Sequence, residues 1–151
     1  KIALWGGAFK ANTDDIREAP SLKIIAALLA EKAAVHIFDP AALSNIEAAF
    51  GARVHYGQDA YEVLTNADAL LIVTEWHEFS SPDFEKIATL MKEPFILDGR
   101  NIYDPEEVAS YGIGYVSIGR KSHTAHLHPR PPTLSSARKL KSSRSRVKLG
   151  L

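Results

Sequence analysis

Short apolar runs alternate along the chain with longer segments in which apolar residues recur at helical spacing. The short runs predict buried strands, and residues 20–33 show the clearest helical pattern, with Leu22, Ile25 and Leu29 on one face. Pro20 suits the first turn of that helix. The predicted strands are residues 2–5, 35–38, 53–56, 69–74, 95–98 and 115–118. The predicted helices are residues 20–33, 41–50, 59–67, 82–92 and 105–111.

This alternation of strands and helices predicts an α/β fold. We expect a Rossmann-like, doubly wound and mostly parallel sheet of six strands, with helices on both faces. Right-handed crossovers favour the strand order 3-2-1-4-5-6. Ligands of such sheets bind outside the carboxyl ends of the strands, at the point where the strand order reverses. The loops after the first, fourth and fifth strands are therefore the candidate site.

The formal net charge of zero hides two parts of opposite sign. Residues 1–119 carry all 18 acidic residues and nine basic ones, a net charge of −9, whereas residues 120–151 carry nine basic residues and no acidic one. Beyond Arg120 the helical and strand periodicity also stops, and few apolar residues remain to be buried. We therefore expect a folded domain over residues 1–120 and a basic, disordered tail over residues 121–151.

The composition excludes several kinds of site. The chain has no cysteine, which removes disulfide bonds, thiolate metal sites and a cysteine nucleophile. The longest apolar run, residues 67–73, is interrupted by Asp68 and is too short to cross a bilayer. With 46% hydrophobic residues, the chain has the composition of an ordinary globular domain. These features are compatible with a cytoplasmic protein.

Three of the nine basic residues in the acidic part lie in the loops of the candidate site. Lys10 and Arg17 lie in the loop after the first strand, which is longer than the roughly two to six residues usual for such a connection. Arg100 follows the fifth strand. Guanidinium and ammonium groups near the start of a helix suit a phosphate or pyrophosphate. The residues alone therefore predict an anion-binding α/β domain.

Two neighbouring residues have plain structural interpretations. Asp39 follows the second strand, where the ribose-binding acid of a dinucleotide fold lies. However, Gly6 and Gly7 do not begin a G-x-G-x-x-G pattern, and Asp39 lies too far downstream of them. We therefore interpret Asp39 and Pro40 as a turn. We interpret Trp76, at the end of the fourth strand, as a core residue rather than a platform on which a base stacks.

Three sequence motifs extend this interpretation. Residues 8–21, AFKANTDDIREAPS, resemble the F-K-x-x-T-x-D-x-R-E-[SA] signature of nucleotide-sugar dehydrogenases, the UDP-glucose/GDP-mannose dehydrogenase family. Residues 74–79, TEWHEF, and residues 95–101, FILDGRN, are similar to two further signatures of that family, in the same order and at the same spacing. The resemblance covers residues 1–120 and ends at the basic tail.

The resemblance implies a Rossmann-like UDP-binding domain, which is the C-terminal domain of these enzymes. Lys10, in the F-K pair, and Arg100, in D-G-R, are implied to contact the UDP-sugar. Arg17, in R-E-[SA], is implied to reach the NAD held by the N-terminal domain. The implied reaction oxidises the sugar C6 hydroxyl to a carboxylate with NAD and a cysteine thioester, and that cysteine belongs to the preceding half of the family's chain. We therefore expect this chain to be inactive by itself.

The implied partners are a UDP-sugar, the N-terminal NAD-binding and central helical domains of the same enzyme, and further copies in a homo-oligomer. The Thr-Glu-Trp form of the second motif favours UDP-glucose, with UDP-N-acetylmannosamine and GDP-mannose as alternatives. A stand-alone UDP-sugar-binding module without catalysis is a second interpretation. A third is binding of nucleic acid through the basic segment 139–146, although nothing in that segment reads bases.

Overall fold

The computed structural model describes residues 1–122. All six strands form one parallel sheet in the order β3-β2-β1-β4-β5-β6, which confirms the predicted fold class and strand order. The strands are β1 (Ile2–Trp5), β2 (Val35–Phe38), β3 (His55–Tyr56), β4 (Ala69–Ile72), β5 (Phe95–Asp98) and β6 (Gly114–Ser117). The predicted basic tail lies outside the described residues, except for Lys121 and Ser122.

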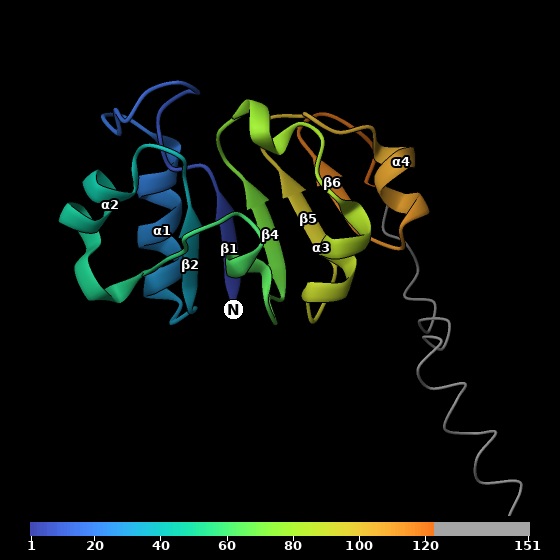
Figure 1. Cartoon of the computed structure of the whole chain (residues 1–151), viewed down its shortest axis with the longest axis horizontal. Helices are drawn as coiled ribbons and strands as arrows, with labels where there is room; N and C mark the ends of the chain where they lie inside the picture. Colours follow the sequence, from blue (N-terminus) through green and yellow to red (C-terminus); the bar gives the residue numbers. More distant parts are fainter. Residues whose placement is uncertain (123–151) are drawn as a thin grey trace, which may run out of the picture.

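Four α-helices and three short 3-10 turns connect the strands (Figure 1). The helices are α1 (Pro20–Ala30), α2 (Leu43–Phe50), α3 (Phe84–Leu90) and α4 (Pro105–Ser110). The 3-10 turns are η1 (Gly51–Arg53), η2 (Glu62–Leu64) and η3 (His77–Phe79). No helix of the described residues is both long enough and apolar enough to span a bilayer.

Local chemistry explains where several helices begin. The carboxylate of Asp83 accepts a hydrogen bond from the backbone N–H of Lys86 and so caps α3. The carboxylate of Asp104 caps α4 in the same way, and Pro105 occupies the first helical position. The predicted starts of these helices are therefore close to the observed ones, because aspartate and proline act within a single turn.

The predicted helix over residues 59–67 is wrong, since only the 3-10 turn η2 forms there. The carboxylate of Asp59 accepts hydrogen bonds from the N–H groups of Tyr61 and Glu62, which starts a turn. Asn66 then adopts a left-handed backbone conformation with φ of 58°, which no α-helix continues. The turn at Asp59 and the left-handed Asn66 therefore limit the helical part of this connection to η2.

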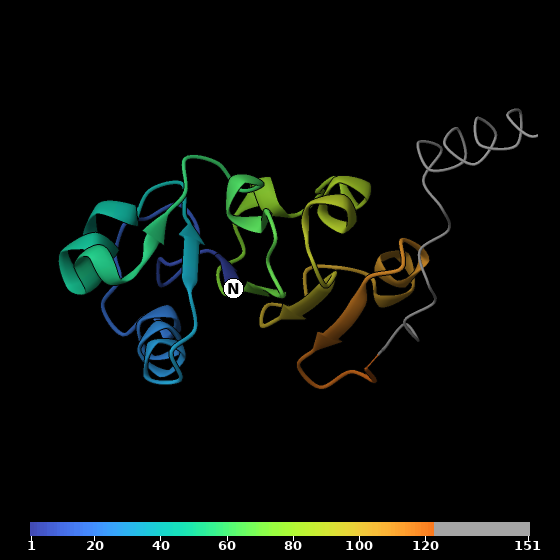
Figure 2. The same cartoon turned by 90° about the horizontal axis from the view of Figure 1, so that it is seen from below.

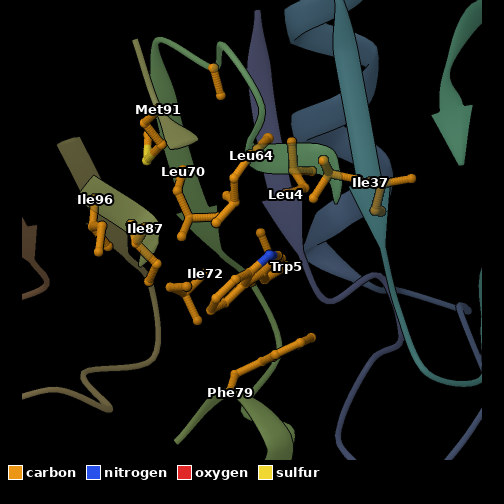
Figure 3. Close-up of a cluster of buried hydrophobic side chains, with 14 of the residues drawn as sticks. Leu4, Trp5, Ile37, Leu64, Leu70, Ile72, Phe79, Ile87, Met91 and Ile96 are labelled. Carbon is orange, nitrogen blue, oxygen red and sulfur yellow. The ribbon is translucent and has the colours of Figure 1, made fainter. Parts of the chain in front are cut away.

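The two faces of the sheet are covered by different elements (Figure 2). Helix α1 packs on one face, and η3, α3 and α4 pack on the other. Figure 3 shows Trp5, Ile72 and Phe79 converging on the face of η3, where the rings of Trp5 and Phe79 stack with centroids 5.0 Å apart. Ile87 of α3 and Tyr115 of β6 are completely buried in the same layer. This layer is the main hydrophobic core and anchors the carboxyl ends of β1 and β4.

The pair of histidines on β2 and β3 predicts a pH dependence of stability. His36 and His55 lie side by side, with ring centroids 4.5 Å apart. Burial, and then the charges of Lys1, His55 and the amino terminus, lower the pKa of His36 to about 4, against the weaker opposing charge of Glu62. Between about pH 6.5 and about pH 4, His36 is protonated in the unfolded chain but neutral in the folded one. The free energy of unfolding should therefore fall as the pH drops through this range.

Urea unfolding at a series of pH values measures this effect. His36→Gln should flatten the slope over that range, whereas His77→Gln, at an exposed position, should leave it unchanged. An identical slope in the His36→Gln variant would show that His36 does not control it.

Candidate functional site

The candidate site lies at the carboxyl edge of the sheet, where β1 and β4 are neighbours and the connections leave in opposite directions. This is the position at which open α/β sheets bind ligands. The loops after β1, β4 and β5 meet there, as the strand order predicts. Their contacts show which side chains the fold holds in place and which remain available to a ligand.

A close approach between backbones joins the first two loops. Gly6 has φ of 93°, and a Cβ atom at this position would lie 2.4 Å from Cβ of Thr74. The hydroxyl group of Thr74, which is completely buried, donates a 2.6 Å hydrogen bond to the carbonyl of Ala8. Only glycine fits between the end of β1 and Thr74, so the loop after β1 leaves the sheet in a single direction.

Asp39 follows β2 and is 2% exposed. One of its carboxylate oxygens, Oδ1, accepts hydrogen bonds from the N–H groups of Ala41 at 2.9 Å and Ala42 at 2.7 Å. These bonds form the turn expected at Asp39 and Pro40. Helix α2 begins after this turn, at Leu43, two residues later than predicted.

The other carboxylate oxygen of Asp39 acts across the fold. Its Oδ2 accepts hydrogen bonds from the N–H groups of Gly7 at 2.7 Å and Ala8 at 3.0 Å. It also accepts one from the indole Nε1 of Trp76 at 3.0 Å. Trp76 is 9% exposed, which confirms its interpretation as a core residue. A single side chain therefore ties the loop after β1 to the loop after β4.

This arrangement closes the place where a dinucleotide fold holds its ligand. In such folds the glycine-rich turn after the first strand presents backbone N–H groups to a pyrophosphate. Here the carboxylate of Asp39 takes the N–H groups of Gly7 and Ala8. Burial of Glu78 raises the pKa of its carboxyl group, and the nearby negative charge of Asp39 raises it further. An anion is therefore disfavoured on the β2 side of the crevice.

Arg100 lies on the opposite side of the crevice and reaches across all three strand ends. Its Nε donates to the carbonyl of Val73 at 2.9 Å, and its Nη2 donates to the carbonyl of Phe9 at 3.2 Å. The carboxylate of Glu75 lies 2.8 Å from the same Nε. The guanidinium is therefore held in one orientation by the loops after β1 and β4. Its Nη1 has no hydrogen-bond partner among residues 1–122.

The loop after β5 is held by hydrogen bonds to the side chain of Asp98. The buried carboxylate of Asp98 accepts hydrogen bonds from the N–H groups of Arg100 at 2.8 Å and Ile102 at 2.9 Å. The hydroxyl of Tyr115 donates to the same carboxylate at 2.7 Å. Burial, followed by the hydrogen bond and the negative charge of Asp98, raises the pKa of Tyr115 above its usual value. Tyr115 therefore stays a hydrogen-bond donor and fixes the backbone that carries Arg100.

Lys10 follows the residue whose carbonyl accepts a hydrogen bond from the Arg100 guanidinium. Arg100 donates to the carbonyl of Phe9, so the next residue, Lys10, leaves the backbone next to the guanidinium. Both Phe9, which is 47% exposed, and Lys10 face solvent. Within the described part of the chain, the Lys10 ammonium has no ion pair or side-chain hydrogen bond. Two cations from loops 90 positions apart in the sequence are thus brought to one edge of the sheet.

Arg17 takes a different position from the other two basic residues. Its guanidinium forms a forked pair with Asp15, with Nη2 2.7 Å from Oδ2 and Nε 3.0 Å from Oδ1. Its side chain is 88% exposed. The hydrogen bonds from Arg17 lower the pKa of Asp15 to about 2, so the pair stays charged throughout the physiological pH range. The structure therefore places Arg17 at the rim of the loop and does not bring it to Arg100.

The sequence interpretation missed the residues that hold the site together: Asp39, Thr74, Glu75 and Asp98. Each is a polar residue within three positions of a strand's carboxyl end, and three of the four are buried. A buried polar residue in this place usually has several hydrogen-bond partners. Burial is a tertiary property, however: the sequence motifs include Thr74, Glu75 and Asp98 but do not show that these residues hold the loops together.

The folded part matches the model of the "UDP-glucose/GDP-mannose dehydrogenase family, UDP binding domain" over residues 3–105. The chain belongs to this family. Its relatives include the UDP-glucose 6-dehydrogenases of Pseudomonas aeruginosa, 45% identical over 79% of this chain, and of Rhizobium meliloti, 42% identical over 80% of it. Each match covers 27% of the relative, so the chain spans about a quarter of their length.

Solved structures of the family share the fold. The NDP-N-acetyl-D-galactosaminuronic acid dehydrogenase of Methanosarcina mazei is 30% identical, with a TM-score of 0.66 over 84% of this chain and 25% of its own. The UDP-glucose dehydrogenase of Pyrobaculum islandicum is 29% identical, with a TM-score of 0.61 over 70% of this chain and 23% of its own. The family's UDP-binding domain therefore includes the carboxyl edge described above.

The buried carboxylate of Asp39 predicts a large effect on stability. Asp39→Ala should lower the free energy of unfolding by roughly 3 kcal/mol or more, because each buried donor left without a partner costs about 1–3 kcal/mol. Asp104→Ala removes an exposed helix cap with two comparable bonds and should cost only about 0.5–2 kcal/mol. Urea unfolding of both variants measures the difference. Equal losses would mean that the bonds across the fold contribute nothing beyond capping.

Proposed function

We propose that this chain is the UDP-sugar-binding domain of a cytoplasmic, NAD-dependent UDP-glucose 6-dehydrogenase, and that Lys10 and Arg100 hold the UDP. The observation that carries the proposal is the position of Arg100, whose guanidinium is fixed against the loops after β1 and β4 while Nη1 remains available. Membership of the family's UDP-binding domain supports it independently.

The chemistry of the edge suits a diphosphate. An arginine in a fixed orientation offers directed N–H donors, and a lysine adds a mobile point charge. Hydrogen bonds between such cations and phosphate oxygens are charge-assisted and stronger than neutral ones. Glu75 offsets part of the positive charge of Arg100, at 2.8 Å from Nε. We therefore assign Glu75 the task of orienting Arg100, which leaves Nη1 available to a phosphate oxygen.

NAD does not fit the usual dinucleotide position in this chain, because the carboxylate of Asp39 takes the N–H groups of Gly7 and Ala8. We assign NAD to the N-terminal domain of the longer enzyme, where it serves as the hydride acceptor. Arg17 is the residue of this chain that we expect to reach it, since its side chain is 88% exposed and its pair with Asp15 holds it at the rim. The nucleophilic cysteine belongs to that same missing part, in agreement with a chain that has none.

Two other functions stay open as alternatives. Relatives in the family include the UDP-D-ManNAc dehydrogenase of Pyrococcus horikoshii, 31% identical, so a related nucleotide sugar is a second substrate candidate. A stand-alone module that binds a UDP-sugar without catalysis would use the same two cations. Both alternatives keep the diphosphate site and differ from the main proposal in the sugar or in the partner domains.

The positions of Lys10 and Arg100 predict that loss of either side chain weakens UDP binding. Lys10→Ala and Arg100→Ala should each weaken UDP binding by about ten- to a hundredfold, since a charge-assisted hydrogen bond contributes about 1.5–3 kcal/mol. The free energy of unfolding should change little in Lys10→Ala, because Lys10 is exposed and unpaired among residues 1–122. Titration with UDP followed by NMR chemical shifts measures affinities in the weak range expected of an isolated domain.

Lys92→Ala is the matched control. Lys92 is 68% exposed and pairs with Asp68 at the amino edge of the sheet, so its loss should leave UDP affinity unchanged. If Arg100→Ala and Lys92→Ala behave alike, the diphosphate does not lie at the carboxyl edge.

The missing domains predict an absence of activity. We expect this chain to reduce no NAD with UDP-glucose, because the turn after β1 is closed to a dinucleotide and the sequence has no thiol nucleophile. Absorbance of NADH over time, compared with a heat-denatured sample, measures this. Turnover by the chain alone would contradict the division of labour between this domain and the rest of the enzyme.

A further inference from the structure

The loop after β5 leads to α4 and carries Arg100, so a contact that fixes this loop also fixes the guanidinium (Figure 1). The last pair of the ladder between β5 and β6 joins Asp98 and Ser117. Beyond that pair β5 ends, while the chain of β6 continues into Ile118. The N–H and carbonyl groups of Ile118 therefore have no partner in the strand ladder.

The side chain of Asn101 supplies that partner. Its Oδ1 accepts a hydrogen bond from the N–H group of Ile118 at 3.0 Å, and its Nδ2 donates one to the carbonyl of Ile118 at 2.9 Å. A carboxamide has an acceptor and a donor side by side, which is what the backbone of a neighbouring strand would offer. The amide of Asn101 therefore extends the contact between β5 and β6 beyond the end of the ladder.

The backbone of Asn101 suits the same task. Its φ is 57°, which lies in the left-handed region. Asparagine adopts this conformation more readily than most residues that carry a side chain, and alanine would be strained there. Asparagine thus combines the two properties that this position needs, a left-handed backbone and a short carboxamide.

Arg100 lies between two anchors of its loop. On one side, the carboxylate of Asp98 accepts hydrogen bonds from the N–H groups of Arg100 at 2.8 Å and Ile102 at 2.9 Å. On the other side, Asn101 binds the segment after β6. The guanidinium reaches carbonyl groups of the loops after β1 and β4 from this position. Its orientation therefore depends on where the two anchors hold the backbone.

We infer that Asn101 is a positioning residue of the diphosphate site, which fastens the loop after β5 to the end of β6 and so fixes the direction of Arg100. The inference rests on the proposed function, in which Arg100 holds the diphosphate of UDP. Asn101 itself needs no contact with the nucleotide, since both polar atoms of its amide bond to Ile118. An arginine that is already held loses less side-chain freedom on binding, and its ligand binds more tightly by that difference.

Lys10 does not share this anchor. It lies in the loop after β1, where Asp39 accepts a hydrogen bond from the N–H of Ala8 and Thr74 donates one to the carbonyl of Ala8. The diphosphate would therefore meet one cation that Asn101 positions and one that it does not. This difference separates a positioning role from a general effect on the fold.

A double-mutant cycle of UDP affinities in the 151-residue chain tests the inference. Asn101→Gly keeps the left-handed backbone and removes the amide, so it should weaken UDP binding by about three- to tenfold. In an Arg100→Ala background the same substitution should change the affinity by less than about twofold, because the side chain to be positioned is gone. In a Lys10→Ala background it should again weaken binding by about three- to tenfold. Titration followed by NMR chemical shifts measures all of these affinities.

Asn66→Gly is the matched control. Asn66 also has a left-handed backbone, with φ of 58°, but it lies before β4 at the amino edge of the sheet. The same change of asparagine to glycine should there leave the affinity for UDP unaltered. Equal losses in Asn66→Gly and Asn101→Gly would overturn the inference, because they would come from the glycine and not from the lost amide.

A measurement without nucleotide separates this inference from the proposed function. The Nε–H group of Arg100 donates to the carbonyl of Val73 at 2.9 Å, so its proton should exchange with water several-fold faster in Asn101→Gly, as followed by NMR. An unchanged exchange rate would show that Asn101 does not position Arg100, whatever binds there. If exchange quickens but Arg100→Ala binds UDP normally, the positioning holds and the assignment of the diphosphate is wrong. A loss of UDP affinity in Asn101→Gly that persists in the Arg100→Ala background would also overturn the inference.

Discussion

The carboxylate of Asp39 joins three segments that the sequence separates widely. Its two oxygens accept five hydrogen bonds, from the turn before α2, from the first residues after β1 and from the indole of Trp76 after β4. A buried carboxylate is costly unless such donors satisfy it, and the donors are equally costly without it. This mutual requirement fixes how the loop after β1 leaves the sheet, and therefore where Phe9 and Lys10 lie.

The same interaction closes the usual dinucleotide position at the turn after β1 of this domain. The backbone N–H groups that could hold a pyrophosphate at the first turn are used internally. The positively charged group on the β5 side is the guanidinium of Arg100. Its orientation depends on hydrogen bonds to carbonyl groups of the loops after β1 and β4. One side of the crevice carries a buried negative charge and the other a held positive charge.

The strand order also decides how the helices are divided between the two faces of the sheet. The chain crosses the sheet between β3 and β4, so α3 and α4 lie on the face opposite α1. Among residues 1–122, Leu97 of β5 is 38% exposed on the α1 side.

The sequence by itself determined the strands, four of the five helices, the parallel order of the sheet and the family, because these depend on local periodicity and on contiguous motifs. It also indicated that Lys10 and Arg100 lie at one edge, since the carboxyl ends of parallel strands meet there; their roles stay predictions. Only the tertiary structure decided that residues 59–67 form a short turn, that Arg17 pairs with Asp15, and that Asp39 is the hub of the site. Each of these depends on burial and on distances between segments far apart in the chain, and no local pattern of residues encodes such distances.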